Sequence, residues 1–355
     1  MSVASSSRKT AVAPAADYGF FGPDSVTWKV WRYPTSLTIG FQRAVTVEEL
    51  DPALVAAVDA TQAIRYRPRA RYDRTLTYFG TVAFGDSARA MKLSDILVKV
   101  HSKAVGIDPL TGNVYDANDP HSQLWIHMTA WHSILYSYER FGPGRLSEAE
   151  ENQYWEECAI AAELQTCDPA DVPRTREGVR QYFESMRPKL AGSIAAQSTM
   201  DHLLDAEVMF PPMPAVATPA VWVVNMVMRW ATIATMPQWM RKMAGLRQGK
   251  LVDLAVTPVM KISMKVLSHP RLSLLVLSVL SPGTEAVFAP VLRNVEPVDP
   301  VVITPAEARE RYGYVKPSEA HHELRAKQRN RVLLEGVAPS DSVITESEAY
   351  LGKVG

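Results

Sequence analysis

Cysteine is almost absent from this chain, which has only Cys158 and Cys167 among its 355 residues. Two cysteines are too few for a disulfide scaffold, and their spacing is not that of the CxxC pairs found in zinc and redox sites. We therefore expect both to be core residues or inactive thiols.

The chain also lacks an excess of charge, since Lys and Arg number 38 and Asp and Glu number 38. Without a positive field to attract phosphates, we expect no nucleic-acid partner. The first 17 residues contain no apolar stretch of the kind that a secretory signal needs. We therefore expect a cytoplasmic protein.

No apolar run is long enough to predict a membrane span. The longest, residues 215–228, is interrupted by Pro219 and Asn225 and closed by Arg229. It falls short of the roughly 20 residues that cross a bilayer. We expect a helix that is buried or touches a membrane, which leaves peripheral membrane association open.

Strand signals are scarce too, because alternating apolar and polar residues and Asn-Gly or Asp-Gly turns are nearly missing. Apolar residues instead recur with a helical period, as Leu93, Ile96, Leu97 and Val100 do. The sequence therefore predicts an all-α fold.

We expect four segments: a disordered N-terminus (1–17), an irregular arm across the core (18–45), an all-α domain (46–296) and a charged helical tail packed outside (297–355). Capping boxes at residues 46–49 and 147–150 predict helix starts near 47 and 148. In the tail, Thr304 to Glu307 opens one helix, and a second is expected at about 319–335.

One expected helix carries several polar residues beside an apolar strip. Arg71 and Thr75 are one turn apart and share a face, and Arg74 is offset by one position. A buried guanidinium needs an anion, so these residues could bind one. The alternative is a solvated basic turn.

Two histidines lie on apolar helices. His101 follows Leu97 by four residues, so its ring leaves the apolar stripe toward the core, where a neutral imidazole can ligate iron. A buried histidine bonded to a backbone carbonyl is the alternative. His127 lies on the apolar face of its own helix. Three roles are open to it: a second ligand, a distal base or a structural hydrogen-bonding group.

Taken together, residues 51–165 resemble the family of haem-dependent rubber oxygenases and MpaB-type oxygenases. The matching motifs are Arg71-x-x-Arg74-Thr75, His101-Ser102-Lys103-Ala104-Val105-Gly106, Asp108-Pro109-x-Thr111-Gly112-x-x-Tyr115, Asp119-Pro120 and Leu124-Trp125-x-His127-x-Thr129. The resemblance implies a globin-like helical core around a b-type haem, within 46–296, and an oxygenase that uses O2 as co-substrate.

The resemblance also implies roles for single residues. His101 would be the proximal iron ligand, and Arg71 and Thr75 would line the haem pocket. Arg74 stands where rubber oxygenase has a lysine able to occupy the distal iron position. Because a guanidinium stays protonated, Arg74 cannot act as that ligand.

The family's glutamate base, upstream of the first arginine, has no direct counterpart here. Residues 55–57 are apolar, and Asp59 is the nearest acid. We therefore expect Asp59 to be the catalytic acid, if the chain has one.

Family members act on carbon–carbon double bonds of isoprenoid chains, which implies a hydrophobic, unsaturated, lipid-like substrate. The Met-rich residues 208–243 could shape its pocket. The alternatives are a haem-binding sensor or carrier without turnover, a di-iron bundle, and a structural or lipid-binding protein. For the di-iron bundle, only the motif Glu319-x-x-His322 fits. The sequence leaves the oligomeric state open.

Overall fold

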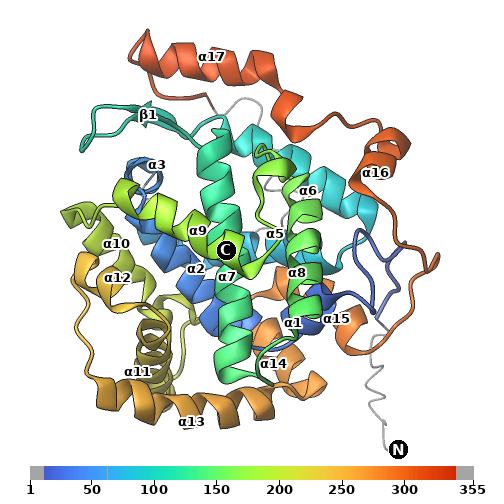
Figure 1. Ribbon diagram of the computed structural model, residues 1–355, viewed down its shortest axis with the longest axis vertical. Helices are drawn as coiled ribbons and strands as arrows, with labels where there is room; N and C mark the ends of the chain where they lie inside the picture. Colours follow the sequence, from blue (N-terminus) through green and yellow to red (C-terminus); the bar gives the residue numbers. More distant parts are fainter. Residues whose placement is uncertain (1–11, 62, 341–355) are drawn as a thin grey trace, which may run out of the picture.

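The computed structural model describes residues 12–61 and 63–340, which form a bundle of helices with one small hairpin (Figure 1). The hairpin pairs β1 (Val105–Ile107) with β2 (Val114–Asp116) in antiparallel register, with Val105 opposite Asp116. The prediction of an all-α fold is confirmed.

The longer helices follow one another with short connections. They are α1 (Val26–Trp31), α2 (Phe41–Val47), α3 (Pro52–Thr61), α4 (Ala63–Tyr66), α5 (Pro68–Phe84), α6 (Ser87–His101), α7 (Pro120–Phe141), α8 (Glu148–Ala162), α9 (Arg176–Met186), α10 (Ile194–Leu203), α11 (Thr218–Ala234), α12 (Gln238–Met243), α13 (Lys250–Leu267), α14 (Pro270–Leu280), α15 (Pro282–Leu292), α16 (Pro305–Tyr312) and α17 (His322–Leu333). Short helical turns join them: η1 (Ser36–Gly40), η2 (Glu48–Leu50), η3 (Pro169–Asp171), η4 (Arg187–Lys189), η5 (Ala206–Met209), η6 (Ala215–Ala217) and η7 (Pro317–Glu319).

Local capping chemistry explains two of the predicted helix starts. Ser147 and Glu150 form a complete capping box at the start of α8. Thr304 and Glu307 form another at the start of α16. Both predictions are confirmed, because in each case the hydroxyl and the carboxylate satisfy N–H groups that a first helical turn leaves free.

The helix start predicted near residue 47 is wrong. Residues 46–49 lie at the end of α2 and in η2, because that helix already begins at Phe41. The Thr46 hydroxyl donates to the Gln42 carbonyl one turn back, 2.6 Å away, and does not cap a new helix. The next helix, α3, begins after Asp51, whose carboxylate accepts from the Leu54 N–H at 3.0 Å.

The arm expected at residues 18–45 is not irregular. It contains α1, η1 and most of α2, and Ser25 caps α1 by accepting from the Trp28 N–H. Residues 1–11 of the expected disordered N-terminus and 341–355 of the expected tail lie outside the described residues. In the described part of the tail, α16 packs on α6 and α17 against β1 (Figure 1).

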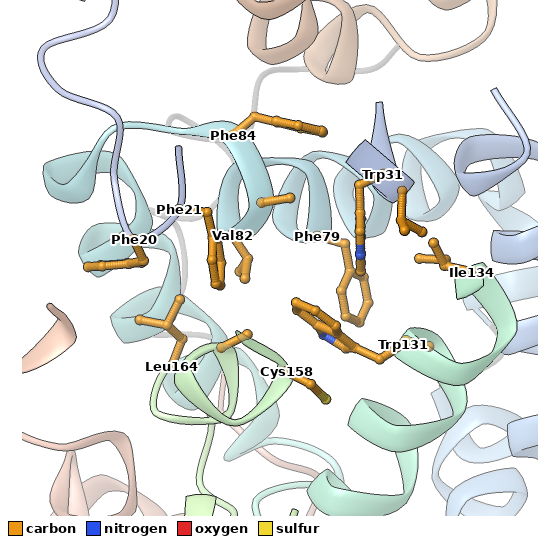
Figure 2. Close-up of a cluster of buried hydrophobic side chains, with 14 of the residues drawn as sticks. Phe20, Phe21, Trp31, Phe79, Val82, Phe84, Trp131, Ile134, Cys158 and Leu164 are labelled. Carbon is orange, nitrogen blue, oxygen red and sulfur yellow. The ribbon is translucent and has the colours of Figure 1, made fainter. Parts of the chain in front are cut away.

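The main core is aromatic and lies between α1, α5, α7 and α8. Trp31 and Trp131 pack with ring centroids 5.2 Å apart, and Phe79 lies beside Trp31 (Figure 2). A second cluster joins Leu50, Trp125 and four buried methionines, and a third joins α13 to α11 and Phe141. Burying these rings provides much of the stability of the fold.

One buried acid fixes the C-terminal helices to α5. Asp73 accepts from the Ser281 hydroxyl at 2.5 Å and from the Gly283 N–H at 3.1 Å. Both donors lie at the joint between α14 and α15. A side chain at Gly283 would collide with Thr77, so glycine is required where α15 meets α5.

Candidate functional site

His101 is the last residue of α6, which Asp86 caps at its start by accepting from the Arg89 N–H. Its Nδ1 lies 3.2 Å from Gln123 Nε2, which itself donates to the Ala117 carbonyl at 2.6 Å. The ring also bonds to the Ala117 backbone. When the ring carries its proton on Nδ1 and donates to the Ala117 carbonyl, its Nε2 holds the lone pair that a ligand needs.

The surroundings of His101 keep its ring neutral. Burial lowers its pKa, and the nearby charge of Arg71 lowers it further, to about 4. At neutral pH the ring therefore carries one N–H and one lone pair. A hydrogen bond from one ring nitrogen to a carbonyl leaves the lone pair on the other, which is the arrangement of metal-binding histidines.

Arg71 and Thr75 lie one turn apart on α5. The Thr75 hydroxyl donates to the Arg71 carbonyl at 2.9 Å, and both residues are half-buried. Arg74 is half-buried beside them. The Arg71 guanidinium makes no hydrogen bond or ion pair with residues 12–61 or 63–340, yet its charge acts on His101. It is a cation placed to accept an anionic partner.

Two acids, the half-buried Glu48 and the buried Glu49, face the same arginine. Glu49 is 1% exposed, and its Oε2 is buried without a hydrogen-bond partner among the residues described. Burial raises its pKa well above the usual range, and Arg71 opposes the shift. Burial likewise raises the pKa of Glu48 to about 8. Both side chains therefore hold a proton in conditions where an ordinary glutamate is ionised.

The sequence does not predict this pair directly, because both acids also fit a capping box that begins at Thr46. A signal was available: Glu49 follows Phe41 and Val45 at four-residue intervals and directly precedes Leu50, so it continues an apolar helical stripe. The Glu48 carbonyl accepts from Trp125 Nε1 at 3.1 Å, which holds η2 against α7.

Asp59, the acid expected from the sequence, lies on α3 with its side chain exposed. Its charge contributes to the raised pKa of Glu49, so it is near that side chain. Val55 and Ala56 on the same helix are buried and apolar. Around Arg71, the acids whose pKa values are raised therefore come from η2, whereas Asp59 of α3 is exposed.

His127 has a different environment. It is fully buried, with Nε2 at 2.7 Å from the Cys158 carbonyl and Nδ1 at 3.1 Å from Gln165 Nε2. Burial lowers its pKa to about 4. Because both ring nitrogens have protein partners, this is the geometry of the third alternative, a structural hydrogen-bonding group. We do not include His127 among the proposed ligands.

The residues of the di-iron alternative lie in the outer tail. Glu319 is in η7 and His322 begins α17, while neighbouring His321 pairs with Asp95 at 2.5 Å. Within residues 12–61 and 63–340, no three His, Cys, Asp or Glu side chains form a group that could hold a bare metal ion.

A comparison with protein families gives one match. The model described as the catalytic domain of ER-bound oxygenase mpaB/B′ and rubber oxygenase matches residues 28–268, more than half of the chain. This confirms the resemblance drawn from the motifs. No curated protein and no solved structure matches the chain. The matched range contains the whole candidate site, from Glu48 to His127.

Proposed function

Since this chain belongs to the catalytic-domain family of ER-bound oxygenase mpaB/B′ and rubber oxygenase, we propose that it is a b-type haem-dependent oxygenase with His101 as the proximal iron ligand. Membership of that family makes it an oxygenase, an oxidoreductase that uses O2. The haem, the ligand and the substrate are our proposal.

The state of His101 carries this proposal. A haem takes four of its iron ligands from the porphyrin, so one histidine of the protein would be enough to hold it. The His101 ring is neutral and bonds to the Ala117 backbone. With its proton on Nδ1 and directed at that carbonyl, Nε2 would carry the lone pair that binds iron. The Arg71 cation nearby, which has no ion-pair partner among the residues that the structure describes, suits a haem propionate. The residues present therefore fit the group.

When bound, haem iron supplies the binding and activation of O2. The protein side chains then control charge and protons around it. Arg71 neutralises an anionic group at the site, and the raised pKa values of Glu48 and Glu49 keep protons at their carboxyl groups. We propose Glu49, in place of Asp59, as the residue that gives or takes a proton during turnover.

The second core cluster supports a hydrophobic substrate. It places Met186, Met200, Met236 and Met240 with Leu50, the residue next to Glu49. Methionine side chains are flexible and adapt to irregular apolar ligands. We therefore propose an unsaturated, isoprenoid-like substrate bound on this side of η2. The cytoplasmic location stays a prediction.

Absorption spectra test the haem and its ligand. Wild-type protein should show a Soret band that shifts on reduction with dithionite. His101→Ala should lose the band, whereas His121→Ala, an exposed histidine at the start of α7, should keep it. A wild-type protein that stays colourless and takes up no added hemin would overturn the proposal.

The alternative to an oxygenase is a haem-binding sensor or carrier, and the exposure of Asp59 favours it. Oxygen consumption separates the two functions. With an isoprenoid alkene, Glu49→Gln should keep the Soret band and lose at least about a hundredfold in rate, the lower end of the usual contribution of a positioned acid or base. Asp59→Asn is the matched control and should change the rate little. Wild type with haem but no substrate-dependent O2 uptake would support the carrier.

A further inference from the structure

Helix α13 has apolar residues on two opposite faces. Val256, Met260 and Met264 recur every four residues and are buried against α11 and α7. Leu251, Leu254 and Ile262, on the other side, are 81%, 70% and 67% exposed. Together with Pro258 and Val266, these outward residues form what we call the α13 face. The next helix, α14, also exposes Leu275 and Val279.

The α13 face lies at one end of the molecule. In Figure 1, α13 runs along the lower edge, with α14 beside it and the β1 hairpin at the opposite end. Its 18 residues give an axis of roughly 27 Å at 1.5 Å per residue. An apolar stripe of this length is far more than the scattered exposed residues of an ordinary surface.

Positive charge follows one edge of this stripe. Lys250, Lys261 and Lys265 are spaced by whole helical turns, are exposed, and make no ion pair within the described part of the chain. Residues 208–284 contain eight Lys and Arg but one acid, Asp253, although the whole chain is neutral. That acid is bonded to Arg241 at 2.9 Å and so does not compensate the lysines.

We propose that the α13 face docks on the surface of a membrane that contains anionic lipids. The outward leucines and Ile262 would enter the boundary between headgroups and acyl chains, and the lysines would reach the headgroup phosphates. This inference does not depend on the haem. A second copy of the chain fits less well, because a symmetric contact through this face would bring like-charged lysines together.

Helix α11 does not take the place of α13 as the membrane contact. Of the described helices, Ala215–Ala234 is long and apolar enough to cross a membrane by length and composition. Polar contacts tie it to the fold: Asn225 donates to Asp205 at 2.8 Å, and Arg229 pairs with Asp201. Its last residues, Ala231 to Ala234, are buried. The contacts favour docking on the surface over insertion.

Vesicle flotation tests the proposal with the full-length protein. At low salt, wild type should bind phosphatidylcholine vesicles that contain about 30% phosphatidylserine. It should bind vesicles of phosphatidylcholine alone much more weakly. Leu254→Asp/Ile262→Asp should lower the partition coefficient at least about tenfold, because two apolar side chains no longer enter the lipid. Ile107→Asp/Leu110→Asp, at the exposed hairpin, is the matched control and should bind like wild type.

A second pair of variants tests the charge separately. Lys261→Gln/Lys265→Gln should bind anionic vesicles about tenfold more weakly at low salt and lose most of the salt dependence. Unchanged binding by both double variants would overturn the proposal, as would no wild-type binding to anionic vesicles. A wild-type dimer that Leu254→Asp/Ile262→Asp converts to a monomer, without vesicle binding, would assign the face to a second copy instead.

Discussion

Helices α7 and α13 are both rich in apolar residues, but α7 is buried nearly all round and α13 is buried on one side only. In α7, even His127, Thr129 and Ser133 are inside and have hydrogen-bond partners. In α13, Leu251 and Leu254 are in solvent while methionines fill the inner face. Apolar content therefore does not say which side of a helix faces the protein.

The largest difference between these helices should appear in stability. Trp131→Ala in α7 should lower the free energy of unfolding by about 3–5 kcal/mol, because a fully buried indole leaves a cavity among Trp31, Phe21 and Tyr154. Leu254→Ala in α13 should change it by less than about 0.5 kcal/mol. Urea unfolding of both variants measures this, and equal losses would show that α13 is buried in solution.

Next in size is the link between α5 and the C-terminal helices. Asp73→Ala should cost about 3 kcal/mol, because the Ser281 hydroxyl and the Gly283 N–H lose a buried carboxylate acceptor. Hydrogen exchange should rise first at α14 and α15. Asp24→Ala, an exposed acid near the N-terminus, is the control and should leave stability unchanged.

The pH dependence of stability tests the buried acids, which α13 lacks. Glu48 has a folded pKa of about 8 against 4.5 unfolded, so between these values the folded protein binds more protons. Its contribution to stability is present below pH 4.5 and is lost as the pH rises to 8. In haem-free protein, Glu48→Gln should not lose this stability. At pH 8 its free energy of unfolding should exceed that of wild type by about 2 kcal/mol, a figure reduced for the partial exposure of the side chain.

Chemical denaturation at pH 5 and pH 8 measures that difference. Glu207→Gln, an exposed acid, should follow wild type at both values. A wild type and a Glu48→Gln variant with the same pH profile would contradict a raised pKa of Glu48 in the folded protein.

The smallest effect should come from the lysines of α13. Lys261→Gln/Lys265→Gln should change the free energy of unfolding by less than about 0.5 kcal/mol, because neither side chain has an ion-pair partner in the described structure. The same variant should still weaken vesicle binding. A clear loss of stability would mean that these lysines serve the fold and not a membrane.

Local chemistry made parts of this fold predictable. Ser147 with Glu150 and Thr304 with Glu307 mark helix starts because a capping box needs only residues close in sequence. The same four-residue pattern at Thr46 does not mark a helix start. The residues there already belong to the end of α2, whose backbone hydrogen bonds use their N–H groups. A local motif cannot show whether its backbone groups are free.

The candidate site was predictable only in part for a related reason. His101 and His127 have similar helical spacing, and burial lowers both pKa values to about 4. What separates them is distant in sequence: Cys158 and Gln165 bond to both nitrogens of His127. Glu49 was missed because its burial depends on how η2 packs against α7, which no local pattern contains.

The hydrogen bonds of Asp73 have a mechanical consequence. In the sequence of α5, Asp73 lies between Arg71 and Thr75. Its partners Ser281 and Gly283 follow directly after the last residue of α14. A tilt of α14 under an outside force must therefore either break these bonds or strain the turn of α5 that carries the site. The helix that carries Arg71 and Thr75 is thus joined directly to the start of α15, so turnover and the position of α14 are expected to affect each other.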